Sequence, residues 1–110
     1  MAGSVRFTSL VAAAATGAGL DLEMLSPRYV HGMQVILTGA PTAVRVDLEG
    51  STDGGTTWGK VGTWDTADGK GSGDFLFVEG ASVNRLRANL VTLTGGTVPT
   101  VTANINSEPN

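Results

Sequence analysis

Residues 43–58 read AVRVDLEGSTDGGTTW, and they combine one strand, one tight corner and the start of a second strand. In the first half, Val44, Val46 and Leu48 alternate with charged residues. A period of two is the signature of a half-buried strand. The alternation predicts that the three apolar side chains face a core and that the charged residues beside them face water.

The corner follows directly. Two consecutive glycines, Gly54 and Gly55, supply the positive φ angles that tight hairpin turns require. The carboxylate of Asp53 can accept hydrogen bonds from backbone N–H groups across the turn, and Ser51 can cap the same loop. Trp58 is expected to lay its ring over the end of the core. The predicted structural hairpin comprises Ser51, Asp53, Gly54, Gly55, Thr57 and Trp58.

Alternating apolar segments recur along the whole chain, separated by glycine-rich turns, at a spacing of roughly 10–12 residues. The segment 11–25 is an exception. Its alanines favour helix, but Gly17 and Gly19 would end a helix within a turn or two, so we expect a crossing loop with at most one short helical turn, leading into a short strand at 20–25. The pattern predicts an all-β fold, an antiparallel, jelly-roll-like β-sandwich of about seven or eight short strands. The other expected strands are 5–11, 29–39, 43–51, 56–64, 74–80, 82–92 and 97–105.

Length and composition restrict the classes of protein. The 110 residues fit a single domain, 1–110, with a short flexible N-terminal arm at 1–6 and a C-terminal tail at 106–110. The chain has no cysteine, which excludes disulfides and thiol chemistry. A net charge of -3 disfavours a nucleic-acid partner. No apolar run reaches the roughly 18 residues of a membrane span, so no membrane partner is expected.

Residues for catalysis or metal binding are sparse. His31 is the one histidine, and no serine lies in a G-x-S-x-G turn. Asp65, Asp68 and Asp74 share a glycine-rich loop, but their spacing does not fit the calcium-loop pattern. We interpret that loop as solvated and mobile, with a divalent cation site as the alternative. The sequence thus predicts a non-enzymatic protein with no cofactor, no metal and no catalytic residue.

Four basic residues are candidates for contact with a partner. Arg85 and Arg87 share one face of a strand, where a planar guanidinium can bind carboxylates of another protein. An ordinary exposed sheet face is the alternative. Arg6, in the N-terminal arm, is a further candidate. His31 is expected to point to solvent or to pack on a neighbouring subunit.

Residues 51–58 resemble the Asp-box, S-x-D-x-G-x-T-W, known from sialidases and other propeller proteins. Every fixed position matches: Ser51, Asp53, Gly55, Thr57 and Trp58. In those proteins the box is a hairpin corner remote from the active site, and it recurs once per blade. A single copy in a chain of this length cannot form a propeller. The resemblance implies local structure.

The wider order of motifs resembles a family of small β-sandwich structural proteins of tailed bacteriophages. It runs from ATGAG and LDL through LEGSTDGGTTW to RLRANL and VTLTGGTVPTVTANI, and spans roughly residues 5–105. The resemblance implies a virion protein, made in the host bacterial cytoplasm. The favoured role is a capsid decoration (cement) protein that binds the outer surface of the head and stabilises it. The implied partners are the major capsid protein, or another virion protein, and further copies of the chain, with a trimer favoured.

A tail- or fibre-associated carbohydrate-binding module is the alternative. In that interpretation Trp58, Trp64 and Tyr29 stack on sugar rings, and Asp53 or Asp65 binds hydroxyls. Trp58 and Trp64 are six residues apart, so in a regular strand they would share a face. If that face is exposed they form a platform, and if it is buried they belong to the core, which is the outcome we expect.

Overall fold

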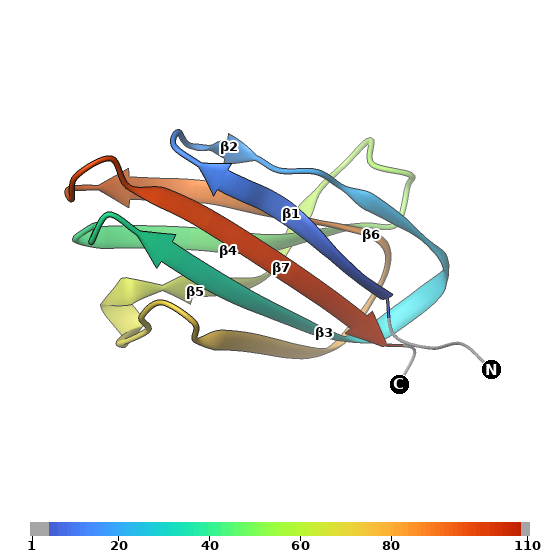
Figure 1. Cartoon of the computed structure of the whole chain (residues 1–110). Helices are drawn as coiled ribbons and strands as arrows, with labels where there is room; N and C mark the ends of the chain where they lie inside the picture. The colour runs from blue at the N-terminus through green and yellow to red at the C-terminus, as the bar shows by residue number, and fades with distance from the viewer. Residues whose placement is uncertain (1–4, 109–110) are drawn as a thin grey trace.

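The computed structural model describes residues 5–108, and the side chains of all of these except 24–29. The fold is an all-β sandwich in which every strand pairing is antiparallel, as the sequence predicts (Figure 1). One short 3-10 helix interrupts the strands. The elements are β1 (Val5–Ala13), β2 (Gly17–Ala18), β3 (Leu22–Thr38), β4 (Ala43–Ser51), β5 (Gly59–Asp65), η1 (Thr66–Asp68), β6 (Phe75–Thr94) and β7 (Thr100–Glu108).

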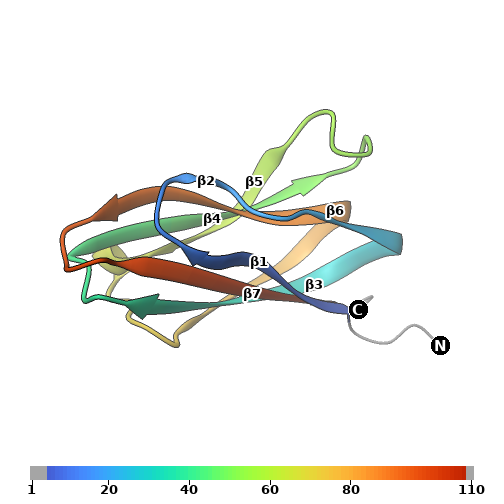
Figure 2. The same cartoon turned by 45° about the horizontal axis from the view of Figure 1, so that its top comes forward.

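Two long strands build both layers of the sandwich. The strand order is β1-β7-β3-β6-β4-β5, with β2 paired to β6. In β6, residues 75–79 pair with 30–34 of β3, whereas residues 85–94 pair with β4. Each half of β6 therefore lies in a different layer. The first part of β3, residues 22–28, likewise pairs with residues 83–86 of β6. We call the layer of β1, β7, residues 30–38 of β3 and the first half of β6 the front layer, and that of β2, β4, β5, the first part of β3 and the second half of β6 the back layer (Figures 1 and 2).

The expectation of uniformly short strands is wrong. Strand β3 has 17 residues and β6 has 20, and each joins two segments that the sequence pattern separates. Gly80 has a φ of 89°, which lets β6 change direction without ending. Register shifts in β3 on either side of Arg28 let that strand change direction in the same way. The chain thus turns from one layer to the other inside a strand.

The segment 11–25 crosses between the layers and enters a strand at Leu22, as expected, but it contains no helical turn and the crossing begins only after Ala13. Strand β1 continues to Ala13, and the following segment stays extended along the second half of β6. The backbone N–H of Gly19 donates to the carbonyl of Ala88 at 2.8 Å, and that of Leu20 donates to the carbonyl of Ser9 at 2.7 Å. These tertiary hydrogen bonds override the helix propensity of the alanines.

The ends of the chain differ from the expected arm and tail. Val5 and Arg6 belong to β1, opposite Ser107 and Asn106 of β7, which continues to Glu108. The predicted arm at 1–6 and tail at 106–110 are therefore strand wherever the structure describes them, because each satisfies the backbone groups of the other. Residues 1–4 and 109–110 lie outside the described residues.

The core lies between the layers, and the alternating residues of β4, Val44, Val46 and Leu48, are buried there as predicted. One expectation fails on the opposite face. Asp47 was expected to face water but is only 8% exposed, because Arg45 and Thr63 both bind its carboxylate, at 3.1 and 3.0 Å. The other buried apolar residues are Leu10, Met33, Val35, Trp64, Val83, Leu86, Ala88, Leu90, Val101, Ala103 and Ile105. Within residues 5–108, no helix has the length and apolar character needed to cross a membrane.

Candidate functional site

The hairpin after β4 satisfies its own polar groups. The hydroxyl of Ser51 donates to Oδ1 of Asp53 at 2.7 Å and accepts from the N–H of Gly55 at 2.9 Å. Oδ1 of Asp53 also accepts from the N–H of Thr57 at 2.9 Å. The N–H of Thr57 and the hydroxyl of Ser51 lower the pKa of Asp53 to about 2. Gly54 and Gly55 have φ angles of 76° and 93°, as the turn requires. The carboxylate of Asp53 thus accepts hydrogen bonds from residues of its own hairpin.

The two tryptophans do not share a face. Trp64 is fully buried, and its Nε1 donates to the carbonyl of Asp74 at 3.0 Å. Trp58 lies on the outer surface of the back layer, with Cζ of Arg87 4.2 Å from its ring centroid. Strand β5 has a bulge, an extra residue between the partners of Leu48 and Glu49. The extra residue places Trp58 and Trp64 on opposite faces. A sugar platform built from Trp58 and Trp64 is therefore ruled out, and the side chain of Tyr29 lies outside the described residues.

The arginines of β6 are held within the chain. Nε of Arg87 binds Glu49 at 2.7 Å, and Arg85 lies 3.4 Å from Asp21 and 3.3 Å from Glu23. They occupy the predicted exposed face of the second half of β6, in the back layer. Their guanidinium groups form an internal ionic network, so binding a partner would compete with these carboxylates.

His31 is fully buried, which corrects the expectation that it faces solvent or a neighbouring subunit. Its Nε2 lies 2.7 Å from the carbonyl of Ala81, and its Nδ1 lies 2.8 Å from Oγ of Ser107. A carbonyl can only accept, so Nε2 carries the hydrogen and Nδ1 accepts from the serine in the neutral ring. Burial lowers the pKa of His31. It sits where β3, β6 and β7 meet and joins them.

Two of the three aspartates of the glycine-rich loop, Asp65 and Asp74, bind separate parts of the backbone. Asp65 accepts from the N–H of Ala67 at 2.9 Å and caps η1, while Asp74 accepts from the N–H of Gly71 at 2.6 Å. Among residues 5–108, no group of three or more His, Asp or Glu side chains converges as a metal site would require. The carboxylates shape the loop.

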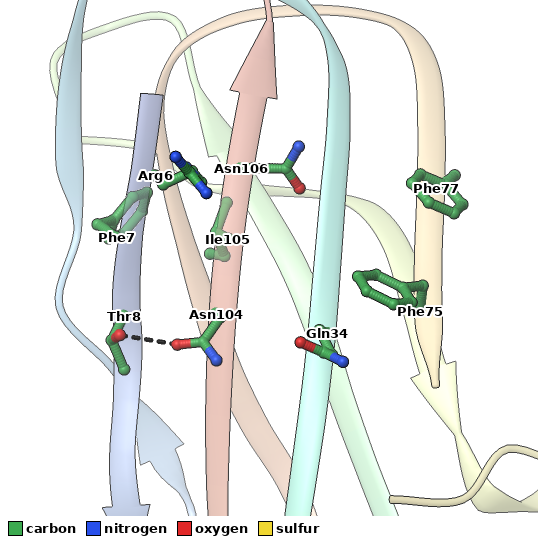
Figure 3. Close-up of a pocket in the computed structure, with 9 residues that line it drawn as sticks. All are labelled: Arg6, Phe7, Thr8, Gln34, Phe75, Phe77, Asn104, Ile105 and Asn106. Atoms are coloured by element: carbon green, nitrogen blue, oxygen red, sulfur yellow. Dashed lines mark hydrogen bonds between the residues drawn. The ribbon is translucent and has the colours of Figure 1, made fainter. Parts of the chain in front are cut away.

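The outer surface of the front layer carries a different set of groups (Figure 3). Together with Phe7 and Ile105, they line a shallow depression of about 760 Å³. We call this surface the amide face. It comprises Arg6 and Thr8 of β1, Gln34 of β3, Phe75 and Phe77 of β6, and Asn104 and Asn106 of β7.

Strand alternation brings these residues together. Thr8 pairs with Asn104, which pairs with Gln34, which pairs with Phe75, so one row of partners crosses all four strands. The hydroxyl of Thr8 donates to Oδ1 of Asn104 at 2.7 Å, which fixes that amide. Gly32 leaves room for Asn106, because a Cβ at Gly32 would collide with the Asn106 side-chain oxygen.

Phe75 and Phe77 are the most unusual part of the amide face. They are 46% and 69% exposed, and their rings stack with centroids 5.6 Å apart and planes 8° apart. Adjacent exposed aromatic rings signal a contact surface. Amides donate and accept hydrogen bonds, and Arg6 adds one positive charge. Rings beside donors and acceptors are suited to binding a partner.

Sequence reasoning found only part of this surface. Arg6 was predicted as a contact residue and lies on it, whereas the phenylalanines and the amides were missed. The segment DFLFVEG reads as a short apolar strand, in which two phenylalanines resemble core residues. The available signal was their shared parity with Glu79, because an exposed charged residue two positions on indicates the outer face.

Comparison with known proteins gives the fold. No family model and no curated protein matches the chain. The crystal structure of the SPBc2 prophage-derived protein YomS is similar, with a TM-score of 0.64 and 13% identity over 96% of this chain and 92% of that one. The Yersinia pseudotuberculosis-derived mitogen has a TM-score of 0.52 and 11% identity over 98% of this chain and 87% of its own. The chain therefore has a β fold found in a prophage-derived protein.

Proposed function

We propose that the chain is a non-enzymatic structural protein of a tailed-bacteriophage particle, located on the capsid surface as a decoration protein. In this role it binds the major capsid protein on the outside of the head and stabilises the shell. The observation that carries the proposal is the stacked, exposed Phe75–Phe77 pair beside the row of amides. The fold shared with a prophage-derived protein supports the phage context.

The amide face has the composition of a docking surface. Its rings supply apolar contact area, its amides supply donors and acceptors, and Arg6 attracts carboxylates. The arginines of the back layer, Arg45, Arg85 and Arg87, by contrast, already bind carboxylates of the same chain. We therefore assign the contact with the shell to the front layer, and we propose that the back layer faces away from it.

The test is binding to heads that lack the protein. Purified chain is added to such heads, the bound copies are counted after sedimentation, and the temperature at which the heads break is measured. We expect saturable binding and a higher breaking temperature. Failure of the wild-type chain to bind either heads or tails would overturn the proposal.

A matched pair of charge reversals identifies the face. Arg6→Glu changes the amide face, and Lys60→Glu makes the same change at an exposed position in the back layer. We expect Arg6→Glu to weaken binding by ~10-fold or more, and Lys60→Glu to bind like the wild type. Equal effects of the two substitutions would contradict the assignment of the front layer.

A carbohydrate-binding module of a tail or fibre is the second candidate, and the same face favours it. Exposed rings beside Gln34, Asn104 and Asn106 offer apolar contact and hydrogen-bond partners for sugar hydroxyls. Titration with polysaccharide from a host cell surface, followed by NMR of the side-chain amides, tests it. Shifts confined to the amide face would favour the glycan over the capsid as ligand.

A further inference from the structure

The first half of β6 is an edge strand of the front layer. Residues 75–79 pair with β3 on one side only, since β6 is the last member of the order β1-β7-β3-β6 within this layer. In Figure 3, Phe75 and Phe77 lie on this outer strand, beside Gln34 of β3. An edge strand exposes a row of backbone donors and acceptors that can pair with another chain.

The direction of those backbone groups follows from the pairing. The backbone N–H of Val35 donates to the carbonyl of Asp74 at 3.3 Å, so the backbone groups of residues 35, 33 and 31 point to β6 and bind every second residue of it. The N–H and C=O groups of Phe75, Phe77 and Glu79 therefore point away from β3. Nζ of Lys70 confirms this, because it reaches the carbonyl of Phe75 from the open side at 3.0 Å.

We infer that this edge pairs with the same edge of a second copy, antiparallel and two-fold symmetric about Phe77. In that register Phe77 faces its symmetry mate, and Phe75 faces Glu79 of the other copy. The exposed rings of both copies then meet in one cluster on the amide face, where aromatic cross-strand pairs stabilise a sheet. Outward groups at three positions of each copy allow about six backbone hydrogen bonds.

Charge complementarity supports a second copy as the occupant. A lysine at a sheet edge ordinarily discourages pairing, and Lys70 reaches this edge from the loop that precedes β6. Here the proposed register brings Glu79 of the second copy opposite Phe75, whose carbonyl holds Lys70. The two-fold axis repeats this contact, so each copy's Lys70 forms an ion pair with Glu79 of the other copy. The two ion pairs lie at opposite ends of the paired strands. The lysine, which would discourage most strands from pairing at this edge, therefore stabilises pairing with a second copy.

The pairing goes beyond the proposed function. It joins the front layers of two copies into one continuous sheet with a doubled amide face, whatever that face binds. Two linked contact surfaces bind a repetitive lattice more tightly than one. A two-fold pair also differs from the trimer that the family resemblance implies.

The mass in solution is the first test, measured by sedimentation equilibrium over a concentration series up to ~1 mM. We expect a species of about twice the chain mass of 11.2 kDa. Phe77→Pro removes an outward N–H without removing a bond to β3, so it should abolish the dimer and leave the fold intact. Phe77→Ala keeps that N–H and should weaken the dimer less. A monomer, a trimer or a dimer insensitive to Phe77→Pro would overturn the inference.

A charge exchange gives the second test, at positions outside the core. Glu79→Lys and Lys70→Glu should each weaken the dimer by ~10-fold or more, because like charges then face each other. The double variant restores the opposite charges in exchanged positions and should recover wild-type affinity to within about threefold. Loss without recovery would contradict the register.

Different results would contradict the virion role and the edge-to-edge dimer. A chain that forms the dimer but ignores heads and tails leaves the edge pairing intact and removes the virion role. A strictly monomeric chain that binds heads through the front layer does the reverse.

Discussion

Nδ1 of His31 lies 2.8 Å from Oγ of Ser107, and both side chains are fully buried. The contact joins β3 to β7, and the other ring nitrogen joins the pair to Ala81 of β6. A neutral imidazole satisfies both partners without placing a charge in the core. His31 is therefore a structural residue whose protonation acts against the folded state.

We expect the stability of the protein to fall in weakly acidic solution because of His31. Burial lowers its pKa below 6.5, so the unfolded chain takes up a proton more readily than the folded one. The free energy of unfolding should be constant above about pH 6.5 and should decline below it, by at most about 1.4 kcal/mol per pH unit.

Urea denaturation between pH 8 and pH 5 measures this decline, and His31→Gln is the control. His31 is the one histidine in the chain, so the variant should be less stable at pH 7 but flat across the same range. A wild-type profile that is flat down to pH 5 would show that the ring is protonated in the folded state as easily as in the unfolded one.

The hairpin carboxylate acts in a lower pH range. The pKa of Asp53 is about 2, below its ordinary value of 3.8, so the ionised form stabilises the folded state. That contribution is complete above pH 3.8 and disappears as the pH falls to about 2. We expect Asp53→Asn to lower the melting temperature at pH 6, with the difference from wild type shrinking in acid. Asp68→Asn, the same charge removal at an exposed position, should have little effect at pH 6.

A third prediction concerns the close approach of β4 and β6. A Cβ at Gly50 would lie 2.6 Å from Cγ1 of Val83 and 3.2 Å from its Cβ. Valine is stiff and both residues are buried, so Gly50→Ala should cost about 1–3 kcal/mol of unfolding free energy. Gly59→Ala is the matched control, because a Cβ there meets nothing within 4 Å. Denaturant midpoints that shift equally for both would contradict the packing.

Tryptophan fluorescence separates the two indole environments. Trp64 is fully buried, and Trp58 is half-buried under Arg87. Trp58→Phe should leave blue-shifted emission that a soluble quencher barely affects. Trp64→Phe should leave red-shifted emission that Arg87→Gln shifts further, because the guanidinium shields the ring. Identical quenching of the two variants would contradict the opposite facing of these residues.

The sequence predicts those features that depend on alternation within one strand. Val44, Val46 and Leu48 follow from period two alone, and the all-β class follows from repeating such segments. The hairpin follows from turn chemistry, because Asp53 and two glycines specify that corner locally.

What depends on pairing between strands was not predictable. The bulge that turns Trp58 outward is set by the register of β5 against β4, which the spacing of the tryptophans does not contain. The exposure of Phe75 and Phe77 depends on which face of β6 the other layer covers, and their parity with Glu79 is the one local sign of it. His31 is a different case, because it shares the parity of the buried Met33 and Val35, so its burial follows from alternation within β3.

The pairing of β1 with β7 has a consequence for biosynthesis. Val5 lies opposite Ser107, so β1 is synthesised about 100 residues before the strand with which it pairs. At about 5–20 residues per second, that wait lasts about 5 to 20 seconds. During this interval the nascent chain exposes an unmatched strand, so chaperone capture or premature association should concentrate on incomplete chains.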